Sequence, residues 1–196
     1  MNGEKIRAFV AINLPDAVRK RIVEIQRGLK SFCAEDSVGG ASPDQIHLTL
    51  RFLGSVYSSS LDDLKAAVKL ACRDTKPFEL TAQSLGCFPN TRQPRVIWIG
   101  LEGEPGILAG LQKQLEAATK SWREPEAREF HPHLTLGRVK NLKPRELQEL
   151  SGAIESHAQT IFGSWRVGQI DLMQSKLSPL GATYSKLASF ELMREV

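Results

Sequence analysis

Two copies of the tetrapeptide His-Leu-Thr-Leu carry the side chains of this sequence that are best suited to chemistry. One copy begins at His47 and the other at His133, and the 196 residues contain only four histidines. Imidazole gains and loses protons near neutral pH, so one histidine of a pair can act as a general acid while the other acts as a general base. The repeated motif therefore indicates acid–base chemistry, and neighbouring threonine hydroxyls suit the oxygens of a phosphodiester.

Strand geometry decides where these side chains point. Successive side chains of a strand point to opposite faces, so His47 shares a face with Thr49, and His133 shares a face with Thr135. We expect the leucines to be buried in a core and the two His–Thr pairs to face each other across a groove. There the neutral histidine takes a proton from an attacking water, and the protonated histidine gives one to the leaving oxygen, without a metal or cofactor.

The elements around the two motifs also repeat. Apolar spacing predicts strands over 5–14, 46–54, 78–88, 95–102, 133–139, 164–175 and 183–193, and helices over 14–32, 61–71, 105–122 and 143–157. We therefore predict an α+β fold of two β-α-β-α-β lobes related by a pseudo-twofold axis, with two antiparallel-type sheets lining a central groove and the helices outside. One bilobal domain is expected over 1–196, with lobe one roughly 1–90, lobe two roughly 91–196, and a last strand that can cross between the lobes.

Composition and charge narrow the class of protein. Hydrophobic residues make up 41% and charged residues 24%, as in ordinary globular proteins, and the net charge of +4 suits a phosphate ester or RNA. The cysteines Cys33, Cys72 and Cys87 have no C-x-x-C spacing, which favours reduced thiols over a disulfide framework or a zinc site. Neither a signal peptide nor an apolar membrane span is visible, so we expect a cytoplasmic protein that does not enter a membrane.

Two other interpretations of the histidines stay open on the residues alone. His131 shares a strand face with His133, so that pair and His47 are a candidate zinc site. Pro132 interrupts that strand, however, and Gln45 occupies the position that matches His131 in the other half. A strand histidine can also be purely structural, but histidine is rare in strands and its repetition favours catalysis. We therefore expect no metal and no cofactor.

Six blocks of the chain together resemble the 2H phosphoesterase superfamily, and within it the RNA 2′,3′-cyclic phosphodiesterases (LigT/ThpR type), formerly named 2′-5′ RNA ligases. In order they are RAFVAINLPD, PDQIHLTLRFLGSV, PFELTAQSLGCFP, PRVIWIGL, FHPHLTLGRVK and SKLSPLGATYSKLASFEL. The resemblance implies hydrolysis of a 2′,3′-cyclic phosphate at an RNA 3′ end to a 2′-phosphomonoester. It also implies roles for individual residues: His47 as proton donor, His133 as proton acceptor, Thr49 and Thr135 as phosphate-holding hydroxyls, and Arg138 as a phosphate contact.

Two arginines are candidates for the main phosphate contact, and the sequence leaves the choice open. Arg51 lies four residues after His47, so strict alternation places it on the same face as that histidine. Arg138 lies five residues after His133 and needs a bulge, which Gly137 can supply, to reach that face.

The sequence also does not decide which residues bind the nucleoside. Relatives carry an aromatic residue seven positions before the first histidine, where this chain has Gly40, so a base would stack elsewhere. The candidate platforms are Phe9, Phe88 and Phe130, and a basic rim is expected from Arg51, Arg92, Arg95, Arg138, Lys140 and Lys176.

The expected partner is therefore an RNA or oligonucleotide with a 2′,3′-cyclic phosphate end, bound by a monomer. Two alternatives remain. The same site can act as a phosphodiesterase or reversible ligase on 2′-5′ linked or small cyclic nucleotides, or the chain can be a catalytically weak RNA-binding module, which the two intact His–Thr pairs disfavour.

Overall fold

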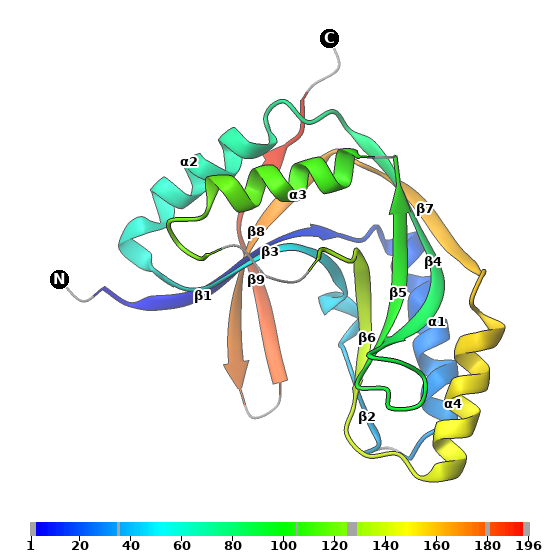
Figure 1. Cartoon of the computed structure of the whole chain (residues 1–196). Helices are drawn as coiled ribbons and strands as arrows, with labels where there is room; N and C mark the ends of the chain where they lie inside the picture. Colours follow the sequence, from blue (N-terminus) through cyan, green and yellow to red (C-terminus); the bar gives the residue numbers. More distant parts are fainter. Residues whose placement is uncertain (1–2, 35, 105, 125–128, 179–180, 194–196) are drawn as a thin grey trace.

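The computed structural model describes residues 3–34, 36–104, 106–124, 129–178 and 181–193 (Figure 1). Its strands are β1 (Lys5–Asn13), β2 (Val38–Gly40), β3 (His47–Tyr57), β4 (Phe78–Phe88), β5 (Val96–Gly103), β6 (His133–Val139), β7 (Ile161–Val167), β8 (Gln169–Ser178) and β9 (Gly181–Glu191). Its helices are α1 (Asp16–Ser31), α2 (Leu61–Cys72), α3 (Ile107–Ala118) and α4 (Pro144–Ser156), with 3-10 turns at Pro43–Gln45 and Ser58–Ser60. The predicted mixture of helices and antiparallel strands is confirmed.

In the described residues the strands form one curled sheet, in the order β7-β4-β5-β6-β3-β1-β8-β9, with β2 attached to β6 (Figure 1). The two strands that carry the HLTL motifs, β3 and β6, are antiparallel neighbours at its centre, where Leu48 pairs with Leu134. The prediction of two sheets is therefore wrong, because hydrogen bonding continues from one half into the other at this pair.

The third strand of each repeat lies in the opposite half of the sheet. β4 pairs with β5 and β7, whereas β8 pairs with β1 and β9. The strand predicted over 164–175 is in fact two strands, since Gly168 separates β7 from β8 and these pair with opposite ends of the sheet. A division of the chain near residue 90 therefore separates strands that are neighbours in the sheet.

In the part of the chain that the structure describes, helices α1 to α4 and one face of the sheet enclose the main hydrophobic core. α2 packs on α3 and β9, and α3 on β3, while α1 packs on β7 and α4 on β4. Val18, Ile22 and Leu29 of α1 point inward at the helical spacing visible in the sequence. Leu48 and Leu134 lie in the same core, 1% and 0% exposed. We call this side of the sheet the core face and the other side, which carries the histidines, the site face.

Two further properties concern the described part of the chain as a whole. None of its helices has the length and apolar character needed to cross a membrane. Its three cysteines, Cys33, Cys72 and Cys87, are unpaired, as the spacing predicts.

Candidate active site

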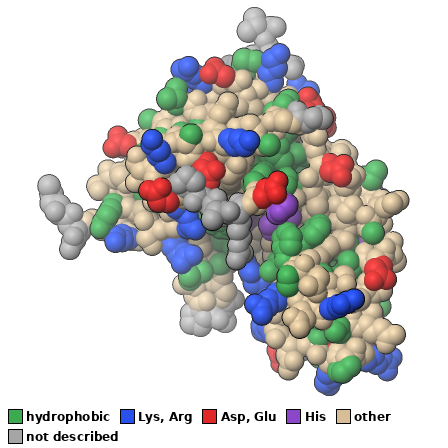
Figure 2. All heavy atoms as spheres, viewed as in Figure 1, with side chains coloured by type: hydrophobic (Ala, Val, Ile, Leu, Met, Phe, Trp, Pro, Cys, Tyr) green, Lys and Arg blue, Asp and Glu red, His purple; other side chains and the backbone are tan. Residues whose placement is uncertain are grey.

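The site face brings the two His–Thr pairs together at the centre of the sheet. Leu48 and Leu134 are a directly opposed pair on the core face, so the residues that flank them point to the other side. Continuing this antiparallel register by one residue sets each histidine across from the threonine of the other motif. All four side chains are half-buried, and Figure 2 shows a histidine within a hollow of the surface.

Each imidazole is oriented by a backbone carbonyl two residues earlier. His47 Nδ1 lies 2.6 Å from the Gln45 carbonyl oxygen, and His133 Nδ1 lies 2.7 Å from the His131 carbonyl oxygen. A carbonyl only accepts, so Nδ1 carries the proton in both rings and Nε2 is the nitrogen left for proton transfer. His47 Nε2 lies 3.0 Å from Thr49 Oγ1, which holds that nitrogen toward its own threonine.

The pKa of each histidine is lowered from its ordinary value. For His47 the main cause is burial, which disfavours the imidazolium, and the Gln45 carbonyl partly opposes it. For His133 burial is again the main cause; the His131 carbonyl opposes it, and the positive charges of His131 and Arg138 add to the lowering. Both imidazoles are therefore biased toward the neutral form until an anionic ligand arrives.

Aromatic side chains enclose the two histidines. Phe9 stacks on the His47 ring at 4.8 Å between centroids, and Tyr184 meets the same ring edge-on at 5.2 Å. Phe88 meets the His133 ring edge-on at 5.2 Å. Phe9 is only 3% exposed, so it supports the imidazole and leaves little surface on which a base could stack.

The most exposed aromatic residue beside the site is one that the sequence did not indicate. Phe52 is 51% exposed, and it faces Phe9 across β1 and β3 with 6.2 Å between ring centroids. Strict alternation from His47 would have turned Phe52 into the core. Phe130, by contrast, packs half-buried against the core. Tyr184 was also missed, because nothing in its local sequence tells which strands its hairpin approaches.

A β-bulge lies at the last leucine of each HLTL motif. Leu50 is the extra residue in β3, since the pairing with β1 passes over it, and Leu136 is the extra residue in β6, since the pairing with β5 passes over it. A bulge reverses the alternation of the residues beyond it. Arg51 therefore turns to the core face and Arg138 turns to the site face.

The expectation that Arg51 faces the histidines is wrong for this reason. Its side chain is buried on the core face, where Nη1 contacts Glu116 Oε1 at 3.0 Å. The guanidinium also donates to Thr119 Oγ1 and to the carbonyls of Arg123 and Glu124. Arg51 is thus a structural cation that ties β3 to α3 and the segment after it.

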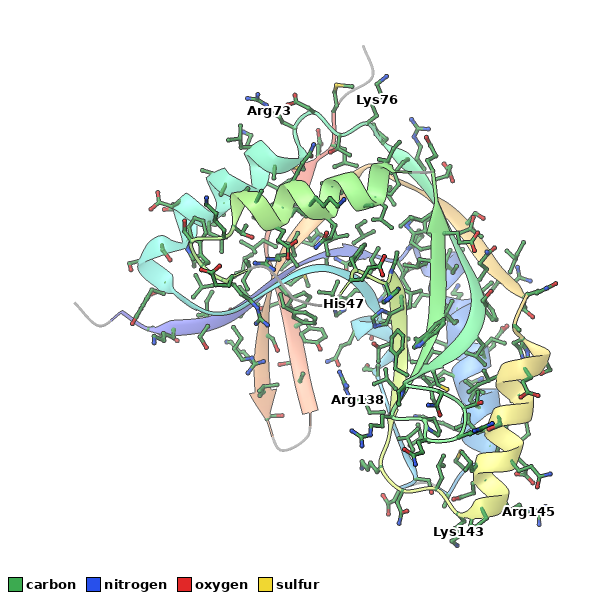
Figure 3. The ribbon with its side chains drawn as sticks, viewed as in Figure 1. His47, Arg73, Lys76, Arg138, Lys143 and Arg145 are labelled. Carbon is green, nitrogen blue, oxygen red and sulfur yellow. The ribbon has the colours of Figure 1, made fainter. Side chains whose placement is uncertain are left out.

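Arg138 is exposed on the site face, as a bulge at Gly137 predicts. Figure 3 shows its side chain in the space between β6 and the β8–β9 hairpin, on the same side as His47. Its charge also reaches His133, whose pKa it lowers. The structure therefore makes Arg138 the better placed of the two arginines.

The rest of the predicted rim is only partly assembled. Arg92, Arg95 and Lys140 are exposed, and the backbone of Arg95 accepts a hydrogen bond from the residue that follows Arg138. Alternation along β8 from Met173, which packs with Phe9, places Lys176 on the opposite face.

The glycine at position 40 is explained by close packing against α1. A Cβ at that position would lie 2.6 Å from Lys30 Cε and 3.2 Å from Gln26 Nε2. An aromatic side chain there would have to displace the neighbouring helix side chains.

The described residues contain no group of three or more His, Cys, Asp and Glu side chains placed to hold a metal ion. Within that part of the chain, His47, His131 and His133 thus do not form the candidate zinc site.

Comparison with known proteins places these features in a family. Residues 14–178 match the model of the 2′-5′ RNA ligase superfamily. The chain belongs to this superfamily. Its membership among the 2H phosphoesterases, which the six sequence blocks predict, is confirmed.

Relatives within the 2′-5′ RNA ligase superfamily match the chain over almost its full length. It is 37% identical to an RNA 2′,3′-cyclic phosphodiesterase of Methanothermobacter thermautotrophicus, over 96% of this chain and 100% of the relative. It is 32% identical to one of Archaeoglobus fulgidus, over 95% and 100%. A solved structure from Thermus thermophilus superimposes with a TM-score of 0.80 at 32% identity, over 97% and 100% of the two chains. Escherichia coli LigT complexed with 3′-AMP gives 0.75 at 25% identity, over 97% and 100%.

Proposed function

We propose that this chain hydrolyses the 2′,3′-cyclic phosphodiester at an RNA 3′ end to a 2′-phosphomonoester, without a metal ion. The observation that carries the proposal is the pair of histidines on one face of adjacent strands, each with Nδ1 on a carbonyl and Nε2 left for proton transfer. Relatives that span the whole chain bear the name RNA 2′,3′-cyclic phosphodiesterase, which supports the same activity.

The reaction divides between the two histidines. His133, neutral at Nε2, takes a proton from water as the water oxygen forms a bond to phosphorus. His47, protonated at Nε2, gives its proton to the 3′ oxygen as the bond from phosphorus to that oxygen breaks. The products are a free 3′ hydroxyl and a 2′-phosphomonoester, and solvent exchange restores both imidazoles. The lowered pKa of His133 suits a base, while the anionic substrate must raise the pKa of His47 for it to act as the acid.

The groups that hold the phosphate surround this pair. Thr49 and Thr135 present hydroxyls to the non-bridging oxygens, and Arg138 supplies the positive charge that developing negative charge requires. Phe52 is an exposed aromatic side chain that contacts Phe9, and Phe9 stacks on His47, so we assign the terminal nucleoside to its side of the site. The common position of the bulges in both motifs supports descent from a duplicated unit with a pseudo-twofold axis.

The test is an RNA oligonucleotide ending in a 2′,3′-cyclic phosphate, incubated with the protein in EDTA, with the product identified by phosphorus NMR. We expect a 2′-phosphomonoester. Loss of activity on chelation that zinc or manganese restores would replace the two-histidine mechanism with a metal one. A 3′-phosphomonoester would instead reverse the assignment of the leaving oxygen.

A second candidate is joining or cleavage of 2′-5′ linkages at the same site, and the description of the matching family favours testing it. The same incubation with a 2′-5′ linked dinucleotide, or with a 5′-hydroxyl acceptor added to the cyclic phosphate, measures it directly.

A further inference from the structure

The bulge in β6 lacks the side-chain anchor that follows the bulge in β3. In β3 the residue after the bulge is Arg51, whose side chain reaches across to α3. In β6 the matching residue is Gly137, which has no side chain to do the same. Whatever holds the second bulge must therefore come from another element. This matters because that bulge alone turns Arg138 toward the histidines.

A buried glutamine of α1 meets the bulge at its extra residue. Gln26 Nε2 donates one hydrogen bond to the Leu136 carbonyl and one to the Ala41 carbonyl, each at 2.7 Å. The Ala41 amide donates to the same Leu136 oxygen at 3.0 Å, so the three groups form one closed set. Both protons of the amide nitrogen are used.

Gln26 is also unusual among its neighbours on the helix. The inward positions of α1 are otherwise apolar, with Val18, Ile22 and Leu29 buried beside it. A buried amide is costly unless its hydrogen bonds are made, so a glutamine on this stripe is stable only with those carbonyl partners. The stripe would bury more apolar surface with a leucine at this position.

The strands around Arg138 leave it little freedom once the bulge is set. Its backbone lies between Gly39 of β2 and Val96 of β5. A Cβ at Gly137 would lie 3.1 Å from the Gly39 carbonyl oxygen, so strands β6 and β2 are already in close contact there. The orientation of the guanidinium therefore follows from the bulge.

We propose that Gln26 is a positioning residue for Arg138: by bridging the carbonyls of Leu136 and Ala41 it fixes the bulge that aims the guanidinium at the substrate phosphate. The phosphate contact itself rests on the proposed function, whereas the link between Gln26 and Arg138 does not. Gln26 acts on the reaction only through that arginine.

A double-mutant cycle on kcat/KM tests the link in catalysis. The variants are Gln26→Met, which keeps the volume but donates nothing, Arg138→Ala, and both together. Each single change should lower kcat/KM by about 10- to 100-fold, the range for one hydrogen bond to a charged group. The double variant should be within about twofold of Arg138→Ala, because Gln26 has nothing left to position.

Ile22→Val is the matched control, since it weakens the same face of α1 without touching the two carbonyls. Its effect should multiply with that of Arg138→Ala. Losses that multiply for Gln26→Met as well would overturn the proposal, and so would a folded Gln26→Met variant with wild-type kcat/KM.

The second readout needs no activity. Moving the Arg138 charge away should raise the pKa of His133, measured by NMR titration of its ring, because a nearby cation disfavours the imidazolium. Gln26→Met and Arg138→Ala should raise it alike, and the double variant no further. If the wild type fails to hydrolyse the cyclic phosphate, the proposed function fails while this titration still decides the role of Gln26. Should neither Gln26→Met nor Gln26→Leu fold, Gln26 supports the whole fold, and the proposal is refuted.

Discussion

Replacing Arg51 with methionine removes a guanidinium that is 2% exposed and lies 3.0 Å from Glu116 Oε1. Removing one partner of a buried ion pair costs about 3–5 kcal/mol, because the remaining charge loses part of its compensation. The Glu116 side chain is 21% exposed, so water recovers part of that loss. The carbonyls of Arg123 and Glu124 also lose a charged donor. We expect Arg51→Met to lower the free energy of unfolding by about 3 kcal/mol, at the lower end of that range.

Urea denaturation measures this loss, and Arg138→Met is the matched variant. Arg138 is exposed, so its replacement should change the free energy of unfolding by about 0.5 kcal/mol or less. The order of the two variants should be the opposite for the loss of affinity for inorganic phosphate, measured by calorimetry at a temperature where both variants are folded. There Arg138→Met should bind more weakly and Arg51→Met should bind as the wild type does. An Arg51→Met variant of unchanged stability and weakened phosphate binding would refute the assignment of Arg51 to the core face.

Three further results are expected. His47→Ala and His133→Ala should each lose roughly two to four orders of magnitude in kcat, and the double variant should lose far less than the product of the two losses. An aryl ester with a good leaving group should partly rescue only His47→Ala, and equal rescue of both variants would refute the donor and acceptor roles. Activity should fall as pH rises through the pKa of His47 and as pH falls through that of His133. Because burial lowers both pKa values in the free protein and an anionic substrate raises them, the kcat/KM profile should lie at lower pH than the kcat profile; the opposite order would contradict the burial argument. Phe52→Ala should weaken binding of a 2′-nucleotide but not of inorganic phosphate in calorimetry, since we assign its exposed ring to the terminal nucleoside; equal weakening of both would assign Phe52 to the phosphate instead.

The sequence predicted the arrangement of the histidines and threonines in the candidate site, because each HLTL motif lies on a strand. Alternation holds from His47 to Leu50 and from His133 to Leu136, so the faces of the histidines and threonines follow from spacing alone. It fails one residue later, where each strand bulges. Gly137 gave a local signal for the second bulge, whereas nothing in Leu50 or its neighbours marks the first.

The pairing partners of the outer strands could not be predicted from the sequence, for a different reason. Local apolar spacing shows that residues 78–88 form a strand, but not which strands it joins. Its pairing with β5 and β7 depends on contacts between distant segments. Tyr184 reaches His47 through the same kind of long-range pairing, since β9 joins β8 and β8 joins β1. Gly168, between β7 and β8, was the one available sign that two strands met there.

The exchange of β4 and β8 between the halves makes each half depend on the other for its assembly. A fragment cut in the turn between β4 and β5 would leave β4 without both of its neighbours and α1 without β7. The complementary fragment would keep the β8–β9 hairpin but lose β1, against which it lies. Neither fragment keeps the strand neighbours that its own core needs, so we expect the two halves to fold only together. The two histidines therefore lie on strands that meet only when both halves of the chain are present.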